Sequence, residues 1–134
     1  QVFFCTMKKY SLQDFSHIGE DLAVRYLVSK GYTVICRNYR KRYGEIDIIV
    51  EKDQHLVFCE VKTRTSHSIS WALASIGFSK QRKISRTAQL YINENPKFAK
   101  HIFRFDVLLV FYCQNTDTFE IQHLENAFDP ILEY

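Results

Sequence analysis

Two consecutive segments of the chain, residues 44–50 and 55–64, alternate between apolar and other side chains with the period of a β-strand. If residues 51–54 form a four-residue connection, the two strands pair antiparallel and Asp47 lies opposite Phe58. This register gathers the apolar side chains on one face, whereas a slip of one residue would set acidic groups against them. We therefore expect a β-hairpin that packs one face into a core and carries charged groups on the other.

Three of these charged groups, Asp47, Glu60 and Lys62, converge on the second face of the expected hairpin. Two carboxylates so close raise each other's pKa unless a cation lies between them. Oxygens of Asp47 and Glu60, with the carbonyl of Val61 and water, suit Mg²⁺ or Mn²⁺. Lys62 would then orient or deprotonate an attacking water, or offset charge on a phosphate. The same spacing also fits a solvated strand face with ordinary cross-strand ion pairs, so both interpretations stay open.

Further short motifs surround these charges along most of the chain. In order, they include Gly19-Glu20, Gly31-Tyr32, Arg37-Asn38-Tyr39-Arg40, Gly44-Glu45-Ile46-Asp47, Glu60-Val61-Lys62-Thr63-Arg64, Arg104-Phe105-Asp106 and Asn126-Ala127-Phe128. Over residues 15–128 this pattern resembles the YraN-type family of predicted endonucleases, within the PD-(D/E)XK nuclease superfamily. Two departures are Cys59, where the family more often has a small β-branched residue, and residues 67–70, which lack its usual glycine.

The resemblance implies an α/β fold: a restriction-endonuclease-like mixed β-sheet flanked by helices, related to archaeal Holliday-junction resolvases. It also implies that Asp47, Glu60 and Lys62 occupy the metal and catalytic positions.

Glu20 lies within a predicted helix over residues 16–30, where apolar residues recur at helical spacing and Gly31 provides the stop. On that helix it falls beside Ala23 and Leu27, so it should face the protein. A carboxylate in that position needs a partner, which makes Glu20 a candidate catalytic acid, in agreement with its position in the family. A rim glutamate paired with Arg25 or with an arginine of the sheet fits equally well.

The remaining elements predict a single domain over residues 1–134, in which residues 1–6 are a non-native or disordered extension. We expect strands over 32–40, 101–113 and 118–124, with a turn at 114–117. We expect helices over 71–76 and 79–93, the second capped by Ser79 and followed by Pro96.

Basic residues cluster on both sides of the hairpin motif, and the net charge of +3 with a pI near 8.7 is compatible with a polyanionic partner. The candidate nucleic-acid-binding residues are Arg40, Arg42, Arg64, Lys80 and Arg86. Trp71 and Tyr43 are candidates for stacking on bases or for ordinary packing. Taken singly, such basic runs are more often solvated turns and helix faces.

Four scattered cysteines without C-x-x-C spacing argue against a zinc site, and none of the five histidines has metal-pair spacing. Unpaired thiols and the lack of a secretory segment or a membrane-length apolar run predict a cytoplasmic protein with no membrane partner.

Three functions of different classes remain. The first is a Mg²⁺- or Mn²⁺-dependent endonuclease acting on DNA, including branched DNA, as a homodimer if two strands are cut symmetrically. The second is a non-catalytic nucleic-acid-binding module on the same fold. The third is an interaction scaffold with a solvated charged hairpin. The presence of Asp47, Glu60 and Lys62 together favours the first over the second.

Overall fold

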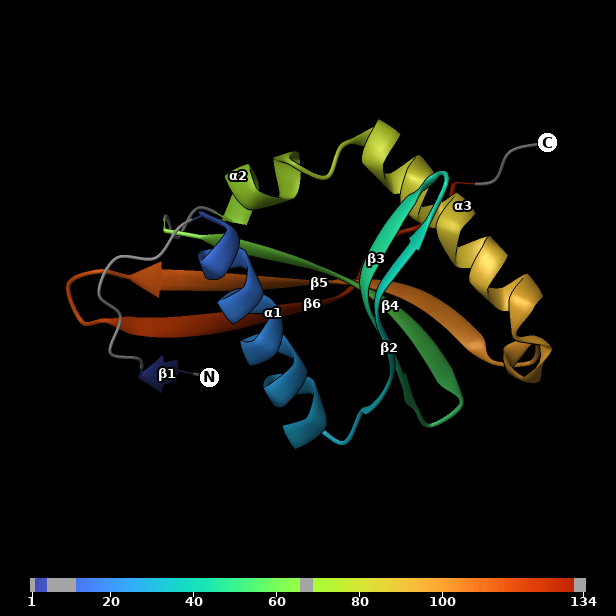
Figure 1. Cartoon of the computed structure of the whole chain (residues 1–134), viewed down its shortest axis with the longest axis horizontal. Coiled ribbons are helices and arrows are strands. Elements are labelled where there is room, and N and C mark those ends of the chain that lie inside the picture. Colours follow the sequence, from blue (N-terminus) through green and yellow to red (C-terminus); the bar gives the residue numbers. More distant parts are fainter. Residues whose placement is uncertain (1, 5–11, 66–68, 132–134) are drawn as a thin grey trace.

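The computed structural model describes residues 2–4, 12–65 and 69–131 and contains one mixed β-sheet with helices packed on both faces (Figure 1). The strands are β1 (Val2–Phe4), β2 (Thr33–Lys41), β3 (Gly44–Lys52), β4 (His55–Arg64), β5 (Ile102–Cys113) and β6 (Thr118–Phe128), in the sheet order β1-β6-β5-β4-β3-β2. The helices are α1 (Leu12–Ser29), α2 (Ile69–Ala74), α3 (Phe78–Glu94) and the short 3-10 helix η1 (Pro96–Phe98). The predicted α/β fold is confirmed, and it is consistent with a restriction-endonuclease-like architecture.

The crossover from β4 to β5 sets the topology. These two strands pair in parallel, so the chain between them must travel back along the sheet, and α2 and α3 make that return. The other neighbouring strands pair antiparallel. None of the helices in the described ranges is long and apolar enough to cross a membrane.

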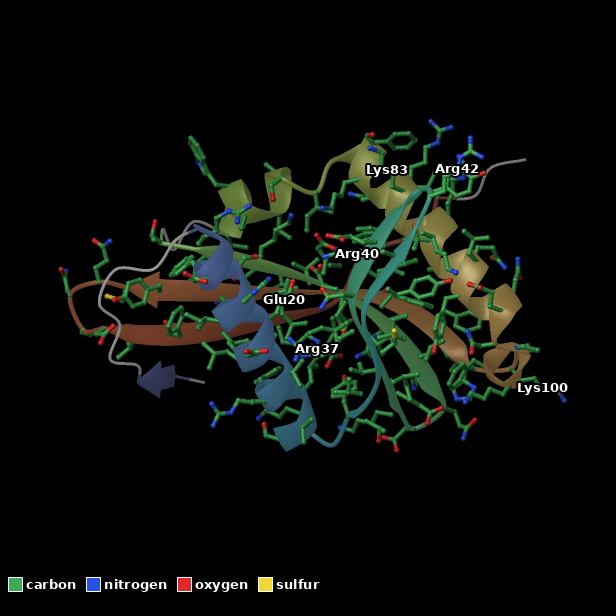
Figure 2. All side chains as sticks on the ribbon, in the orientation of Figure 1. Glu20, Arg37, Arg40, Arg42, Lys83 and Lys100 are labelled. Carbon is green, nitrogen blue, oxygen red and sulfur yellow. The ribbon has the colours of Figure 1, made fainter. Side chains whose placement is uncertain are left out.

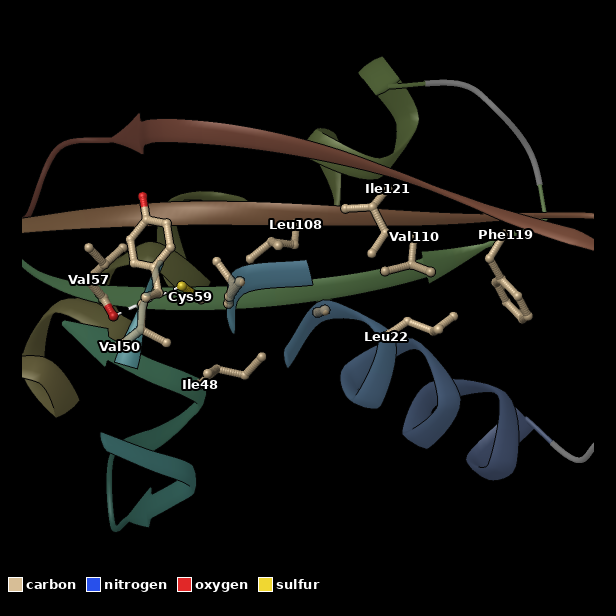
Figure 3. Packing of buried hydrophobic residues seen from close by; sticks show 12 residues of the cluster. Leu22, Ile48, Val50, Val57, Cys59, Leu108, Val110, Phe119 and Ile121 are labelled. Carbon is tan, nitrogen blue, oxygen red and sulfur yellow. Dashed lines mark hydrogen bonds between the residues drawn. The ribbon is translucent and has the colours of Figure 1, made fainter. Parts of the chain in front are cut away.

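One face of the sheet is covered by α1. Leu22, Ala23 and Leu27 of this helix pack on alternate residues of the strands, among them Ile48 and Leu108 (Figure 3). The helical spacing of these three side chains is the reason that a single helix face can bury them together. The face of α1 that carries them thereby fixes where its other residues, including Glu20, meet the sheet.

Gly19 allows α1 to approach β4 closely. A Cβ atom at this position would lie 1.9 Å from Oγ1 of Thr63 and 3.0 Å from its Cβ. Thr63 is the residue after Lys62 on β4, so the close approach sets α1 beside the charged end of that strand. Gly19 therefore permits the contact of α1 with β4, and this contact positions the next residue, Glu20.

The opposite face of the sheet is covered by α3 and α2. Ile84, Ala88 and Tyr91 of α3 pack on Leu56 and Phe58 of β4. In a second cluster, the α2 residue Ala72 and the following Ile76 pack against β5 through Val107, Leu109 and Phe111. The alternation along β5 between these three residues and Leu108 and Val110 on the α1 face shows that the strand is buried on both sides.

The β3–β4 hairpin forms, but its predicted register is wrong by two residues. Ile49, and not Asp47, pairs with Phe58, and the connection is the two-residue turn Asp53-Gln54. Both turn residues have positive φ, 49° and 63°, as a two-residue hairpin turn of type I′ requires. A shift by two does not itself change the face on which a side chain lies, so the register error moves the acids along the sheet without separating them.

The alternation along β3 also changes phase at Asp47, which the sequence does not predict. Ile46 packs with the α3 cluster, whereas Ile48 packs with the α1 cluster, although strict alternation would put both on one face. On β2 the partners of these two residues are Tyr39 and Arg37, and the residue between them, Asn38, has a φ of 52°. Asp47 therefore lies at the point on β3 where the alternation of side chains between the two faces of the sheet changes phase.

The ends of several elements differ from expectation. The cap residue of α3 is Gly77, which makes no side-chain cap bond, so the Ser79 cap is wrong. Val2–Phe4, predicted to lie outside the fold, forms β1 and pairs with β6, while residues 1, 5 and 6 lie outside the described ranges. The loop without the expected glycine also falls largely outside them, at residues 66–68.

Candidate functional site

Asp47 and Glu60 meet where the pairing of β3 with β4 ends. The last pair of the ladder is Ile48 with Cys59, and the next residue on each strand is one of the two acids. Beyond this pair, a hydrogen bond to a side chain takes the place of backbone pairing. The backbone N–H of Val61 donates to Oδ2 of Asp47 over 2.8 Å. Both acids are nearly buried, with 7% and 5% of their surface exposed.

Burial and the neighbouring charge of Glu60 together raise the pKa of Asp47 to about 7, against the hydrogen bond from Val61. More distant contributions come from Glu20 and Glu45, which also raise it. Asp47 therefore holds a proton near neutral pH unless a cation compensates its charge. This is the electrostatic situation that the sequence predicts for two adjacent carboxylates.

Two lysines converge on one oxygen of Glu60. The Nζ atom of Lys62 lies 3.4 Å from Oε1 of Glu60, and the Nζ atom of Lys80 lies 3.1 Å from the same oxygen. Partial burial would lower the pKa of Lys80, but attraction to Glu60 and the hydrogen bond to it raise the pKa above the ordinary value. Lys80 comes from the first turn of α3, so the helix covering the sheet completes the cluster.

Lys80 is the residue whose place sequence reasoning missed. The sequence predicts it only as a candidate nucleic-acid-binding residue, and the structure adds a contact with Glu60, 20 residues earlier in the chain. Its contact depends on how α3 crosses the sheet, which no local spacing reveals. The signal available in the sequence was its position in the first turn of a helix that follows the Glu60 strand.

Oxygen atoms of Asp47 and Glu60 are hard donors and fit Mg²⁺ or Mn²⁺. The side chains in the described ranges form no group of three or more His, Cys, Asp or Glu residues placed to hold a metal. A cation here would thus be held by two side chains, with backbone and water oxygens in the other positions. The predicted backbone ligand is the carbonyl oxygen of Val61.

Glu20 lies at the edge of this cluster, on α1 (Figure 2). Burial raises its pKa, while Arg37 and His17 act in the opposite direction. Arg37, which comes from β2, makes its ion pair with Asp21 at 2.8 Å. Glu20 is therefore close enough to influence Asp47 electrostatically, and the charge of the sheet residue Arg37 acts on it, although the ion pair of Arg37 is with Asp21.

The predicted nucleic-acid-binding arginines occupy three places. Arg40 is largely exposed and pairs with Glu45 at 3.0 Å, beside the acids. Arg64 is exposed at the end of β4, where it donates to the carbonyl of its neighbour Thr63. Arg42 and Arg86 meet over the ring of Tyr43, away from Glu60. The structure therefore places Arg40 beside the acids, Arg64 at the end of β4, and Arg42 with Arg86 at the ring of Tyr43.

Asp106 is a second buried acid, and it belongs to a structural network. Arg104 binds both of its oxygens, at 2.8 and 2.9 Å, and His123 lies 2.7 Å away. Burial would raise the pKa of Asp106, but hydrogen bonds from His123, Arg104 and the Asn126 N–H lower it below the ordinary value. Arg104 and Asp106 therefore form a partly buried ion pair.

These features define an α/β protein of restriction-endonuclease-like architecture with a carboxylate–lysine site between β3 and β4. A family model described as "Uncharacterised protein family UPF0102" matches residues 19–110. A UPF0102 protein of Clostridium botulinum strain Hall is 40% identical over 119 residues, which cover 89% of this chain and 97% of that protein. A UPF0102 protein of Caldicellulosiruptor bescii is 36% identical over 118 residues, 88% of this chain and 99% of that protein. The chain belongs to the UPF0102 family, the YraN-type family that its motifs resemble.

Proposed function

We propose that this protein is a metal-dependent endonuclease that hydrolyses phosphodiester bonds of DNA, as its resemblance to PD-(D/E)XK nucleases implies. One observation carries the proposal: two nearly buried carboxylates, Asp47 and Glu60, adjoin each other, and two lysines contact the second of them. A solvated strand face would leave these groups exposed to water. Their burial has an electrostatic cost that a divalent cation and a phosphate would offset.

The charges of the site match this substrate. With Asp47 ionised, the two carboxylates and the lysines Lys62 and Lys80 sum to zero (−2 and +2), and a divalent cation brings the total to +2. A phosphodiester carries one negative charge and gains more as it is attacked, so the loaded site favours the attacked state. When bound between the acids, Mg²⁺ or Mn²⁺ would polarise a phosphate oxygen and lower the pKa of a water ligand.

The side chains of the protein have distinct tasks in this scheme. Asp47 must give up the proton that burial holds on it, so metal loading and pH are linked. Glu60 holds Lys62 and Lys80 on one oxygen, which fixes both ammonium groups relative to the acids. One of the two lysines would stabilise charge on the phosphate and the other would orient the attacking water. The burial of Lys62, whose side chain is 14% exposed, favours it for the water.

The test is cleavage of labelled linear, flapped and four-way-junction DNA, with a matched RNA, in Mg²⁺ or Mn²⁺ and in EDTA. We expect cleavage only with metal, and a loss of about 100-fold or more in Asp47→Asn and in Lys62→Met, because each variant removes a group that acts on the reacting phosphate. Lys100→Met, which removes an exposed lysine beyond the far end of α3, should cut like the wild type.

The outcomes separate the candidate functions. If DNA is bound with a salt-dependent affinity but never cut, the non-catalytic nucleic-acid-binding module replaces the enzyme. Cleavage that survives in both Asp47→Asn and Lys62→Met would show that the chemistry lies elsewhere in the molecule. Preferential cleavage of the RNA would assign the other nucleic acid as substrate.

A further inference from the structure

A basic cavity of about 290 Å³ lies at the corner where the β2–β3 turn meets α3 (Figure 2). It is lined by Arg42, Tyr43, Ser79, Arg82, Lys83 and Arg86. These six described residues carry four positive charges and no negative charge. Among them, Arg42, Lys83 and Arg86 bring three cations to a cavity whose described lining residues include no acid, so the cavity is suited to an anion.

Tyr43 contacts two of the three arginines that line the cavity. The guanidinium of Arg86 lies 3.7 Å from the centre of the Tyr43 ring, and that of Arg42 lies 6.0 Å from it. A guanidinium stacked on a ring keeps its N–H donors in its own plane, where they can bind a planar or tetrahedral oxyanion. The ring thus arranges the donors before a ligand arrives, which lowers the entropic cost of binding.

The wall of the cavity is fixed by a close contact between the turn and α3. A Cβ atom on Gly44 would lie 3.3 Å from Cβ of Lys83 and 3.3 Å from Oγ1 of Thr87. Glycine at this position lets the turn that carries Arg42 and Tyr43 sit directly on the helix. The same glycine begins β3, the strand that leads to Asp47 three residues later.

The cavity and the carboxylate site share α3. Lys80 on this helix contacts Glu60, and Arg86 lines the cavity six residues later. Ser79, the residue before Lys80, also lines the cavity, so the helix joins the two places directly.

We propose that this cavity binds a backbone phosphate of the nucleic acid whose phosphodiester occupies the carboxylate site, through Arg42 and Arg86 beside the ring of Tyr43. The proposal rests on the proposed function for the identity of the ligand. It adds a second phosphate contact, which would help to set which bond enters the site.

Binding in EDTA tests the proposal without any requirement for cleavage. The Kd of a labelled 20-base-pair DNA is measured by anisotropy over a series of NaCl concentrations. We expect Arg86→Gln to weaken binding by about tenfold and to reduce the salt slope by about 0.9, the value for one phosphate contact. Arg42→Gln should do the same, and the double variant should lower the slope little further, because both arginines contact one phosphate.

Lys100→Gln is the matched control, because it removes one exposed charge at the opposite end of α3 (Figure 2). Circular dichroism and thermal unfolding of each variant establish that it is folded, and Arg42→Gln, in the exposed turn, tests the cavity even if Arg86→Gln unfolds. A salt slope in both arginine variants equal to that of the wild type would overturn the proposal. So would an equal loss in Lys100→Gln, which would indicate general attraction to a positive surface.

Inorganic phosphate distinguishes the source of the anion. We expect it to compete only weakly with the DNA, at tens of millimolar or above, because a single ion lacks the adjoining contacts of the strand. Saturable binding of inorganic phosphate at micromolar concentration, abolished by Arg86→Gln, would instead assign the cavity to a free small anion. Failure of the cleavage assay would leave this binding result intact, so the two proposals can fail separately.

Discussion

At the scale of single residues, the protonation of Asp47 links stability to pH. Its pKa, raised to about 7, means that the folded protein binds a proton more tightly than the unfolded chain, so Asp47 favours folding at low pH and loses that contribution as the pH rises through 7. We expect Asp47→Asn, compared with the wild type, to gain about 2–4 kcal/mol between pH 5 and pH 8 in urea unfolding with EDTA.

Asp21→Asn is the control for that measurement, because it makes the same change at a carboxylate whose ion pair with Arg37 lies at the surface. Addition of Mn²⁺ at pH 8 should raise the melting temperature of the wild type and leave that of Asp47→Asn unchanged. Parallel pH profiles of wild type and Asp47→Asn would contradict the raised pKa, whatever the outcome of a cleavage assay.

At the scale of elements, the contact of α1 with β4 depends on Gly19. We expect Gly19→Ala to destabilise the fold by about 2 kcal/mol, because a rotation of the Thr63 side chain moves Oγ1 but leaves its Cβ 3.0 Å from the new methyl group. The double variant Gly19→Ala with Thr63→Ala should recover part of that loss. Chemical denaturation measures both.

Gly77→Ala provides the comparison. No atom lies within 4 Å of a Cβ built at Gly77, whose φ of −76° suits any residue, so only the weaker capping by alanine should cost stability, about 1 kcal/mol at most. Equal losses at the two glycines would show that helix propensity, and not the approach to Thr63, sets the cost.

The periodicity of the sequence predicts which segments form strands and helices. It does not predict the strand register, which depends on the backbone conformation of single residues. Alternation and helical spacing correctly indicate the β3–β4 hairpin, α1 and α3. The register error arises because the turn residues Asp53 and Gln54 adopt positive φ without the glycine that usually signals such a turn. The phase change at Asp47 accompanies an equally unusual conformation at Asn38. The acids still converge, because a shift by two residues preserves the faces of a strand.

At the scale of the whole molecule, α2, α3 and the β2–β3 turn follow one another along one side (Figure 1). They carry, in that order, the exposed Trp71, then Lys80 with Arg86, and Tyr43. A nucleic-acid strand along this side would meet an aromatic ring, the carboxylate site and the basic cavity. Trp71 is 83% exposed, so a base can reach its ring and stack on it.

Trp71 is the single tryptophan of the chain, so its fluorescence reports this contact directly. We expect quenching on titration with single-stranded or junction DNA in EDTA, and a loss of affinity of about tenfold in Trp71→Ala, the cost of one stacked base. The variant should unfold at the wild-type denaturant concentration, because its ring is mostly in water already. Val28→Ala, an exposed apolar side chain on α1, should change neither property. DNA binding that leaves the emission of Trp71 unchanged would show that the strand follows another course across the protein.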